Sequence, residues 1–188
     1  DQSYLDPLVW PFDADTLRNR AIKAGILGLG GGGFPSFKKW SDGTQTLIIN
    51  GAECEPYLTA DDTLMRIDTD SMIRGACMLS QSLEIKKIII GIEDNKPEAL
   101  EAIESALKES RSDCFFDIVL LDPKYPSGSE RHLVWLTRGI ELPTGSRAVE
   151  SGVIVHNPGT LAALSRAIDG KPITDRIVTL TGEALTTP

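Results

Sequence analysis

The chain has 188 residues, of which 41% are hydrophobic and 24% charged, enough for one domain with a sizeable buried core. Its formal net charge of −8 excludes a strongly basic surface of the kind that contacts nucleic acid phosphates. We therefore expect no nucleic acid partner. No apolar run approaches the ~20 residues that a membrane-spanning helix needs, and the first residues lack the pattern of a secretion signal, so we expect neither a transmembrane segment nor secretion.

The three cysteines lie far apart in the sequence. No two of Cys54, Cys77 and Cys114 have C-x-x-C spacing, so they cannot assemble an iron–sulfur cluster or a zinc site locally. An odd number of cysteines favours reduced thiols over a disulfide framework. The two histidines, His132 and His156, have no matched ligands either, and we expect no metal site.

The first predicted helix, residues 15–23, leads into a glycine run at residues 28–33 with the sequence Gly-Leu-Gly-Gly-Gly-Gly. Bare backbone N–H groups form a concave anion site, so such a run is typical of a phosphate-binding loop. Pro35 suits the first position of a short helix, whose N-terminus would favour the same anion. The run matches the G-x-G-x-x-G fingerprint, but that fingerprint requires a preceding strand. Three interpretations of the run remain: a nucleotide or flavin phosphate loop of another type, a structural linker, or an ordinary dinucleotide loop.

A β-branched strand is predicted at residues 47–50, and an acidic turn follows it. In open parallel sheets ligands bind beyond the carboxyl ends of strands, where Asn50, Glu53 and Glu55 would lie. Because carboxylates repel a phosphate, these side chains would face the polar edge of a heterocycle. A solvated loop is the alternative. We expect Asp61 and Asp62 to cap the start of a helix.

Helices and strands alternate along the rest of the chain. Further helices are predicted at residues 69–83, 96–107, 129–137 and 159–167, and further strands at residues 87–92, 115–121, 153–156 and 176–181. The longest loop is expected at residues 139–151. Such alternation predicts the α/β class, with a mostly parallel sheet in a Rossmann-like, three-layer α/β/α arrangement.

Three blocks of the sequence occur in an order that resembles the C subunit of the Rnf ion-translocating electron transport complex. They are residues 28–40, residues 50–62, and residues 125–130 together with 152–160. More distantly, the chain is similar to the flavin-bearing, NADH-oxidising 51 kDa subunit of respiratory complex I. This resemblance covers nearly the whole chain. It implies an FMN- and NADH-binding domain of the complex I flavoprotein type at residues 1–174, and the start of a truncated, β-rich domain at residues 175–188.

The resemblance also implies roles for individual residues. The glycines would cradle the FMN phosphate and leave space for NADH, Phe34 would face the dinucleotide, and Lys39 would approach the flavin. Two asparagines would contact the flavin, Glu55 the nicotinamide amide, and Glu130 belongs to an acidic block near the site. With Glu53 from the acidic turn, the candidate cofactor-binding residues are Gly30, Gly31, Gly32, Gly33, Phe34, Lys39, Asn50, Glu53, Glu55, Glu130 and Asn157.

Two positions depart from the family pattern. Gly32 stands where alanine is usual, and Ala52 stands where the complex I relatives carry aspartate, so one flavin contact made there is missing here. The cysteine-rich module that holds 4Fe-4S clusters in the Rnf subunit has no counterpart in this chain. We expect those clusters only in the full-length subunit.

The function implied by this resemblance is oxidation of NADH by hydride transfer to FMN, after which electrons leave for iron–sulfur clusters outside this chain. The implied partners are the other subunits of a membrane electron transport complex, on the cytoplasmic side of the inner membrane, with this chain bound peripherally. Two alternative functions remain. One is a flavin and iron–sulfur corrinoid reductase, and the other is a non-catalytic docking domain with a degenerate nucleotide site.

Overall fold

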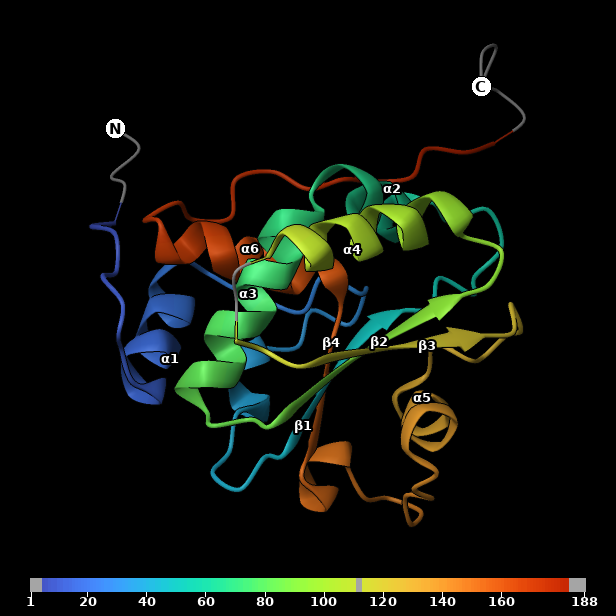
Figure 1. Ribbon diagram of the computed structural model, residues 1–188, viewed down its shortest axis with the longest axis horizontal. Coiled ribbons are helices and arrows are strands. Elements are labelled where there is room, and N and C mark those ends of the chain that lie inside the picture. Colours follow the sequence, from blue (N-terminus) through green and yellow to red (C-terminus); the bar gives the residue numbers. More distant parts are fainter. Residues whose placement is uncertain (1–4, 111–112, 183–188) are drawn as a thin grey trace.

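The computed structural model describes residues 5–110 and 113–182 of the chain. Its centre is a four-stranded parallel sheet with the strand order β3-β2-β1-β4 (Figure 1). The strands are β1 (Thr46–Gly51), β2 (Lys87–Glu93), β3 (Phe116–Leu121) and β4 (Val153–His156). All of them therefore end at the same edge of the sheet, the carboxyl edge, at which ligands bind in this class of fold.

Helices cover both faces of the sheet. One face carries α1 (Ala14–Lys23), α2 (Ala60–Ile67), α3 (Thr69–Ser82), α4 (Pro97–Glu109) and α6 (Pro158–Ile168). The other face carries α5 (Glu130–Arg138) and the short 3-10 helix η2 (Ala148–Ser151), as Figure 1 shows. The predicted α/β class with a three-layer α/β/α arrangement is confirmed.

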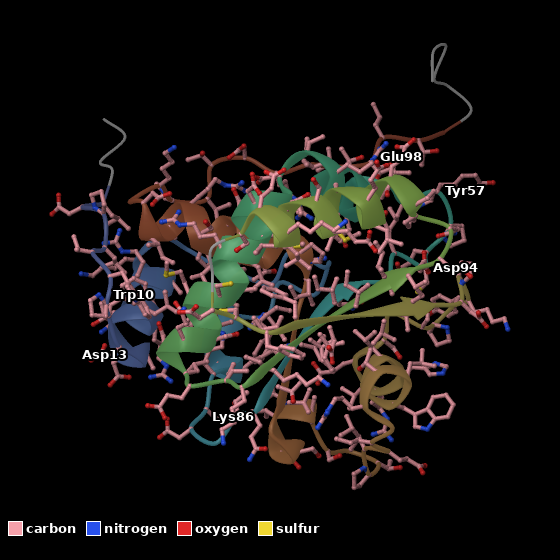
Figure 2. All side chains as sticks on the ribbon, viewed as in Figure 1. Trp10, Asp13, Tyr57, Lys86, Asp94 and Glu98 are labelled. Atoms are coloured by element: carbon pink, nitrogen blue, oxygen red, sulfur yellow. The ribbon has the colours of Figure 1, made fainter. Side chains whose placement is uncertain are left out.

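Figure 2 marks the two ends of the sheet. Lys86 precedes β2 at one end, while Asp94, which follows β2, lies at the other end with Tyr57 of the acidic turn. The turn that follows β1 therefore lies at the carboxyl edge, where the sequence predicted it.

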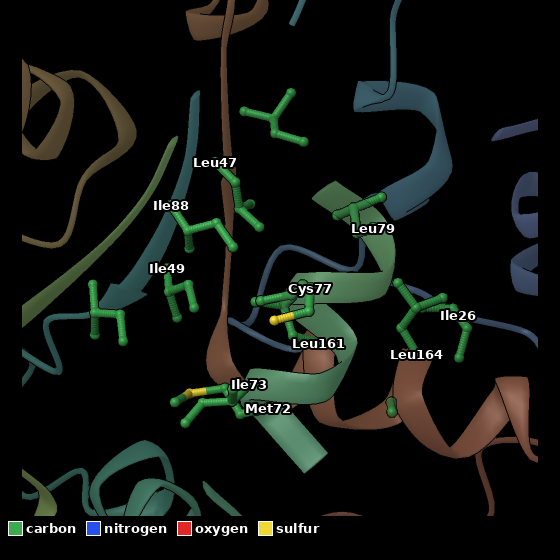
Figure 3. Packing of buried hydrophobic residues seen from close by; sticks show 14 of the residues in the cluster. Ile26, Leu47, Ile49, Met72, Ile73, Cys77, Leu79, Ile88, Leu161 and Leu164 are labelled. Carbon is green, nitrogen blue, oxygen red and sulfur yellow. The ribbon is translucent and has the colours of Figure 1, made fainter. Parts of the chain in front are cut away.

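The core divides along the pleat of the central strands. In β1, Leu47 and Ile49 point into the larger cluster with α3 and α6 (Figure 3). Ile48 belongs to a smaller cluster with α5. All three side chains are fully buried. Strands that are buried on both faces read as continuous apolar runs, and for this reason the sequence predicts them well.

Helices α3 and α6 approach each other closely at Gly75. A Cβ atom at this position would lie 2.0 Å from the carbonyl oxygen of Leu161, so only glycine fits there. The apolar stripe of α3 predicted from helical spacing packs at this contact, with Met72, Ala76 and Leu79 fully buried.

One predicted element is wrong, and a second differs in its type and first residue. The segment at residues 176–181 forms no strand. It runs outside the sheet along the helical layer, pairs with no strand of the described residues, and leaves Val178 and Leu180 exposed. The β-branched composition of this segment indicated a strand, but a strand exists only where a partner supplies hydrogen bonds. Residues 183–188 of the expected second domain lie outside the described residues.

The second correction concerns the helix expected to begin at Pro35. The chain forms only a four-residue 3-10 helix there, η1 (Ser36–Lys39), and Pro35 is the residue before it. So short a helix adds little dipole to an anion site, because the dipole sums over aligned peptide groups. The expected loop at residues 139–151 is confirmed apart from η2, which occupies its end.

Candidate functional site

The glycine run is a closed loop at the surface. Its stem is an antiparallel bridge between Leu27 and Pro35, and the amide of Gly28 donates to the carbonyl of Phe34 at 2.8 Å. The loop is anchored to α6, since the amide of Leu29 donates to Thr160 Oγ1 at 2.9 Å. A helix, a bridge and a loop therefore replace the strand, turn and helix of an ordinary dinucleotide site, which argues against that alternative.

The backbone within the run is open to solvent. Residues 30–34 are exposed, and a Cβ at Gly31, Gly32 or Gly33 would meet no atom within 4 Å. Gly31 and Gly33 have φ values of 92° and 56°, which disfavour other residues. The run thus presents bare backbone at the surface in a conformation that requires glycine at two positions.

Lys39 and Glu130, from different motif blocks, form an ion pair. Lys39 Nζ lies 2.9 Å from Glu130 Oε2 and donates to the carbonyl of Val155 at 3.1 Å. Glu130 Oε1 accepts from the amide of Ala148 at 3.3 Å. Nearby, the guanidinium of Arg147 lies 4.9 Å from the centroid of the Phe34 ring. These contacts bring η1, α5 and the end of β4 together beside the glycine run.

Asn50 joins the second block to the third. Its Nδ2 donates to the carbonyl of Gly128 at 2.8 Å, and its Oδ1 accepts from the amide of Ala52 at 3.3 Å. The two backbones touch here, because a Cβ on Gly128 would lie 2.7 Å from the carbonyl oxygen of Ala52. Within the described residues, the buried hydroxyl of Ser127, next to this contact, has no hydrogen-bond partner.

Glu53 caps helix α2. Its Oε1 accepts from the amide of Asp61 at 2.9 Å and its Oε2 from the amide of Asp62 at 3.2 Å. Its side chain is only 3% exposed, and Lys96 Nζ lies 3.8 Å away. Asp61 and Asp62 lie in the first turn as expected, but the oxygens that satisfy the helix come from Glu53, which sequence analysis did not foresee.

Asn157 caps helix α6. Its Oδ1 accepts from the amide of Gly159 at 2.9 Å, and its Nδ2 donates to Asp61 Oδ2 at 2.6 Å. A Cβ on Gly30 would lie 3.4 Å from the Cβ of Asn157, so the asparagine touches the glycine run. Burial, followed by the nearby Glu53 charge, raises the pKa of Asp61 to about 6. The hydrogen bond from Asn157 acts in the opposite direction and lowers this pKa.

A cavity of about 600 Å³ lies between the glycine run, α2 and α6. Of the predicted site residues, Gly30, Gly31, Glu53, Glu55 and Asn157 line it. A strap, defined here as residues 175–179, lines it as well, although the sequence assigned that segment to another domain. The remaining candidates are absent from its lining: Gly32, Gly33, Phe34, Lys39, Asn50 and Glu130.

A buried hydrogen bond connects these two groups of candidates. Trp40 Nε1 donates to His156 Nε2 at 2.9 Å, and both side chains are buried. Burial and the nearby Lys39 charge lower the pKa of His156 to about 3. Lys39 precedes Trp40, and Asn157 follows His156. The hydrogen bond therefore holds the backbone next to Lys39 against the backbone next to Asn157.

The described part of the chain holds no metal site of the kind that histidine, cysteine and carboxylate ligands build. Within residues 5–110 and 113–182, these side chains form no group that could hold a metal ion. In the same part of the chain, every helix is too short or too polar to cross a membrane.

Bacterial relatives of this chain carry names that describe an electron-transferring complex. The C subunit of the ion-translocating oxidoreductase complex of Pectobacterium atrosepticum is 51% identical over 178 residues, which are 93% of this chain and 25% of that protein. The Yersinia pestis protein of the same name is 46% identical over 180 residues, covering 94% of this chain and 28% of the relative. The chain therefore spans about a quarter of the length of these relatives.

Solved structures share the fold. A chain of an NAD⁺-reducing [NiFe]-hydrogenase in the H₂-reduced state superposes with a TM-score of 0.74 at 23% identity, over 83% of this chain and 31% of that one. The sequence model of the Nuo51 FMN-binding domain family matches residues 22–166, which include the glycine run, the acidic turn, Glu130 and Asn157. The chain thus belongs to the Nuo51 FMN-binding domain family and is a homologue of the C subunit of ion-translocating oxidoreductase complexes.

Proposed function

We propose that this chain is the FMN- and NADH-binding domain of a membrane-associated electron transport complex subunit. It oxidises NADH by hydride transfer to the flavin, and the electrons leave for iron–sulfur clusters outside these residues. The observation that carries the proposal is the meeting of all three motif blocks at the carboxyl edge of the sheet. Asn50 contacts Gly128, Lys39 pairs with Glu130, and Asn157 touches the glycine run.

The chemistry of these groups fits a flavin mononucleotide. Exposed amides in the run of Gly30 to Gly33 can donate to the phosphate oxygens without a side chain in the way. Lys39, which pairs with Glu130, supplies a cation beside the run. A ligand with a phosphate group would suit both the exposed amides and this cation.

Asn50 and Asn157 would orient the flavin. Each side chain uses one N–H on a neighbouring carbonyl or carboxylate, which fixes the amide and leaves its second N–H for a ligand. Two rigid donors at separate points define the rotation of a planar ring. Amides held in this way lose little conformational entropy when the ligand binds.

Glu55 would hold the nicotinamide. Unlike Glu53, whose two oxygens cap α2, Glu55 is exposed on the acidic turn and lines the cavity. Its carboxylate can therefore accept from the N–H₂ of a carboxamide. When bound, FMN supplies the chemistry, taking two electrons as hydride and releasing them singly. The chain's task is to stack the two rings within about 3 to 3.5 Å, with no acid or base required.

The cellular setting is also part of the proposal. Relatives of this chain are named as subunits of an ion-translocating complex, which supports membrane association and contact with other subunits. We extend this to a peripheral position on the cytoplasmic side of the inner membrane. The 4Fe-4S clusters that accept the electrons would lie in the remainder of such a subunit, since this chain spans about a quarter of the relatives' length.

Anaerobic titration tests the proposal. The purified chain is mixed with FMN, freed of excess flavin, and titrated with NADH while the visible flavin band is followed. Retention of FMN and bleaching by NADH are expected, with Asn50→Ala as the variant that should retain less flavin. Absence of both signals in the wild type would refute catalysis, and capture of complex subunits by that same protein would favour the docking alternative.

A further inference from the structure

The strap ties together the two loops that carry most of the candidate site. Arg176 Nη2 donates to the carbonyl of Leu29, at the start of the glycine run, at 3.1 Å. At the other end of the strap, Thr179 Oγ1 accepts from the amide of Thr59, the residue before α2, at 2.9 Å. The strap crosses the helical layer between these points (Figure 1). It is therefore one wall of the cavity.

The cavity has an excess of negative charge. Five carboxylate residues line it against two arginines, Arg166 and Arg176. Arg166 is already neutralised, because its guanidinium forms an ion pair with Asp68. Arg176 forms no ion pair with any carboxylate of the described residues, although its charge reaches Asp61 and lowers the pKa of that group. Of the two arginines that line the cavity, Arg176 is thus the one whose charge is available to a ligand.

Geometry and donor count suit this side chain to a phosphate. Arg176 is exposed, lines the cavity with Gly30 and Gly31, and spends one N–H of its five on the Leu29 carbonyl. A guanidinium presents two parallel N–H groups to two oxygens of a phosphate. Backbone amides alone would have to hold the anion against Glu53, Glu55 and Asp61, and an added cation offsets part of that repulsion.

We propose that Arg176 binds a phosphate group of the nucleotide held at the glycine run, completing an anion site whose other donors are the backbone amides of Gly30 and Gly31. The inference rests on the proposed function and adds to it a residue from outside the three motif blocks. The phosphate belongs either to FMN or to the pyrophosphate of NADH, and the two sources are separable by experiment.

The test compares three ligands by isothermal titration of the 188-residue chain. FMN carries a monophosphate, riboflavin is the same ring system without it, and ADP-ribose carries the pyrophosphate of NADH without the nicotinamide. Arg176→Ala is expected to weaken FMN or ADP-ribose binding about tenfold or more, the effect of losing a charge-assisted hydrogen bond, and to leave riboflavin unchanged. Arg176→Lys should recover part of the affinity. Lys171→Ala, which removes an exposed charge outside the cavity lining, should change nothing.

Each outcome decides a separate question. A loss confined to FMN assigns Arg176 to the flavin phosphate, and a loss confined to ADP-ribose assigns it to the dinucleotide. If the wild type binds FMN and Arg176→Ala binds both phosphate ligands as tightly, the inference is overturned and the proposed function stands. An equal loss of riboflavin affinity also overturns it, because the strap would then act on the shape of the site. A wild type that binds none of the three ligands refutes the inference and the proposed function together.

Discussion

Asn157 and Asp61 connect the first turns of two helices, with Nδ2 of the asparagine 2.6 Å from Oδ2 of the aspartate. The same carboxyl group lies beside the buried Glu53, and burial is the main reason that its pKa rises from 3.8 to about 6. The folded protein therefore binds this proton more tightly than the unfolded chain does. The stability that this proton provides is complete below about pH 4 and is lost as the pH rises through about 6.

We expect Asp61→Asn to remove this pH dependence. An asparagine at this position still accepts from Asn157 through its carbonyl oxygen but cannot ionise. Relative to wild type, the variant should be similar at about pH 4 and more stable by about 2 kcal/mol at about pH 7.5, measured by urea unfolding across that range. Parallel pH profiles for the two proteins would show that Asp61 ionises normally in the fold.

Glu53→Ala should destabilise the protein substantially. It deprives two amides at the start of α2 of their acceptors and leaves Lys96 without its partner. We expect a loss of about 2 to 4 kcal/mol in the free energy of unfolding, and a smaller loss for Glu53→Gln, which keeps one acceptor oxygen. Glu55→Gln is the control, since that side chain is exposed and its loss should change stability by less than about 0.5 kcal/mol. Equal stability of Glu53→Ala and Glu55→Gln would contradict the capping role.

Gly128→Ala tests the contact between the second and third motif blocks. Its Cβ would lie 2.7 Å from the Ala52 carbonyl oxygen, so the two backbones must separate and the Asn50 hydrogen bond to Gly128 must lengthen. We expect a lower melting temperature and weaker FMN retention. Gly32→Ala is the matched control for stability, because a Cβ there meets no atom within 4 Å. A Gly128→Ala protein that melts at the same temperature as Gly32→Ala would refute this packing.

His156 should stay neutral across the physiological range. Its Nε2 accepts from Trp40, and burial holds its pKa at about 3. Below pH 6.5 the unfolded chain takes up a proton on this residue that the folded chain does not, so stability falls as the pH is lowered from there. In NMR spectra, the His156 Cε1–H signal should not move between about pH 8 and about pH 4.5. A titration midpoint within that window would rule out the buried, neutral ring.

Most regular elements were predictable from the sequence. The strand at residues 47–50 and the helix at residues 69–83 are found within one residue of the predicted ends, because the first is buried on both faces and the second carries an apolar stripe. Patterns of this kind involve residues that are close together in the chain, so they can be recognised from the sequence alone. The same local reading failed at residues 176–181, where β-branched residues occur but residues 5–110 and 113–182 provide no partner strand.

The candidate site was less accessible to prediction. The motif resemblance named Lys39, Asn50 and Asn157, and the structure gives their neighbours, but their contacts with a cofactor stay predictions. The helix cap by Glu53, the Asp61 contact with Asn157, and the position of Arg176 arise from pairs of residues that are brought together by the fold. No spacing rule in a single sequence encodes which turn lies next to which helix end.

The Trp40–His156 hydrogen bond has a consequence for how quickly a cofactor can be accepted. It fixes two interior rings whose chain neighbours, Lys39 and Asn157, are candidate flavin contacts. The distance between those contacts is therefore set by the interior and exists before any ligand arrives. A preorganised receptor of this kind spends little of its binding energy on rearrangement, so association would be governed by encounter and dissociation by the quality of the contacts.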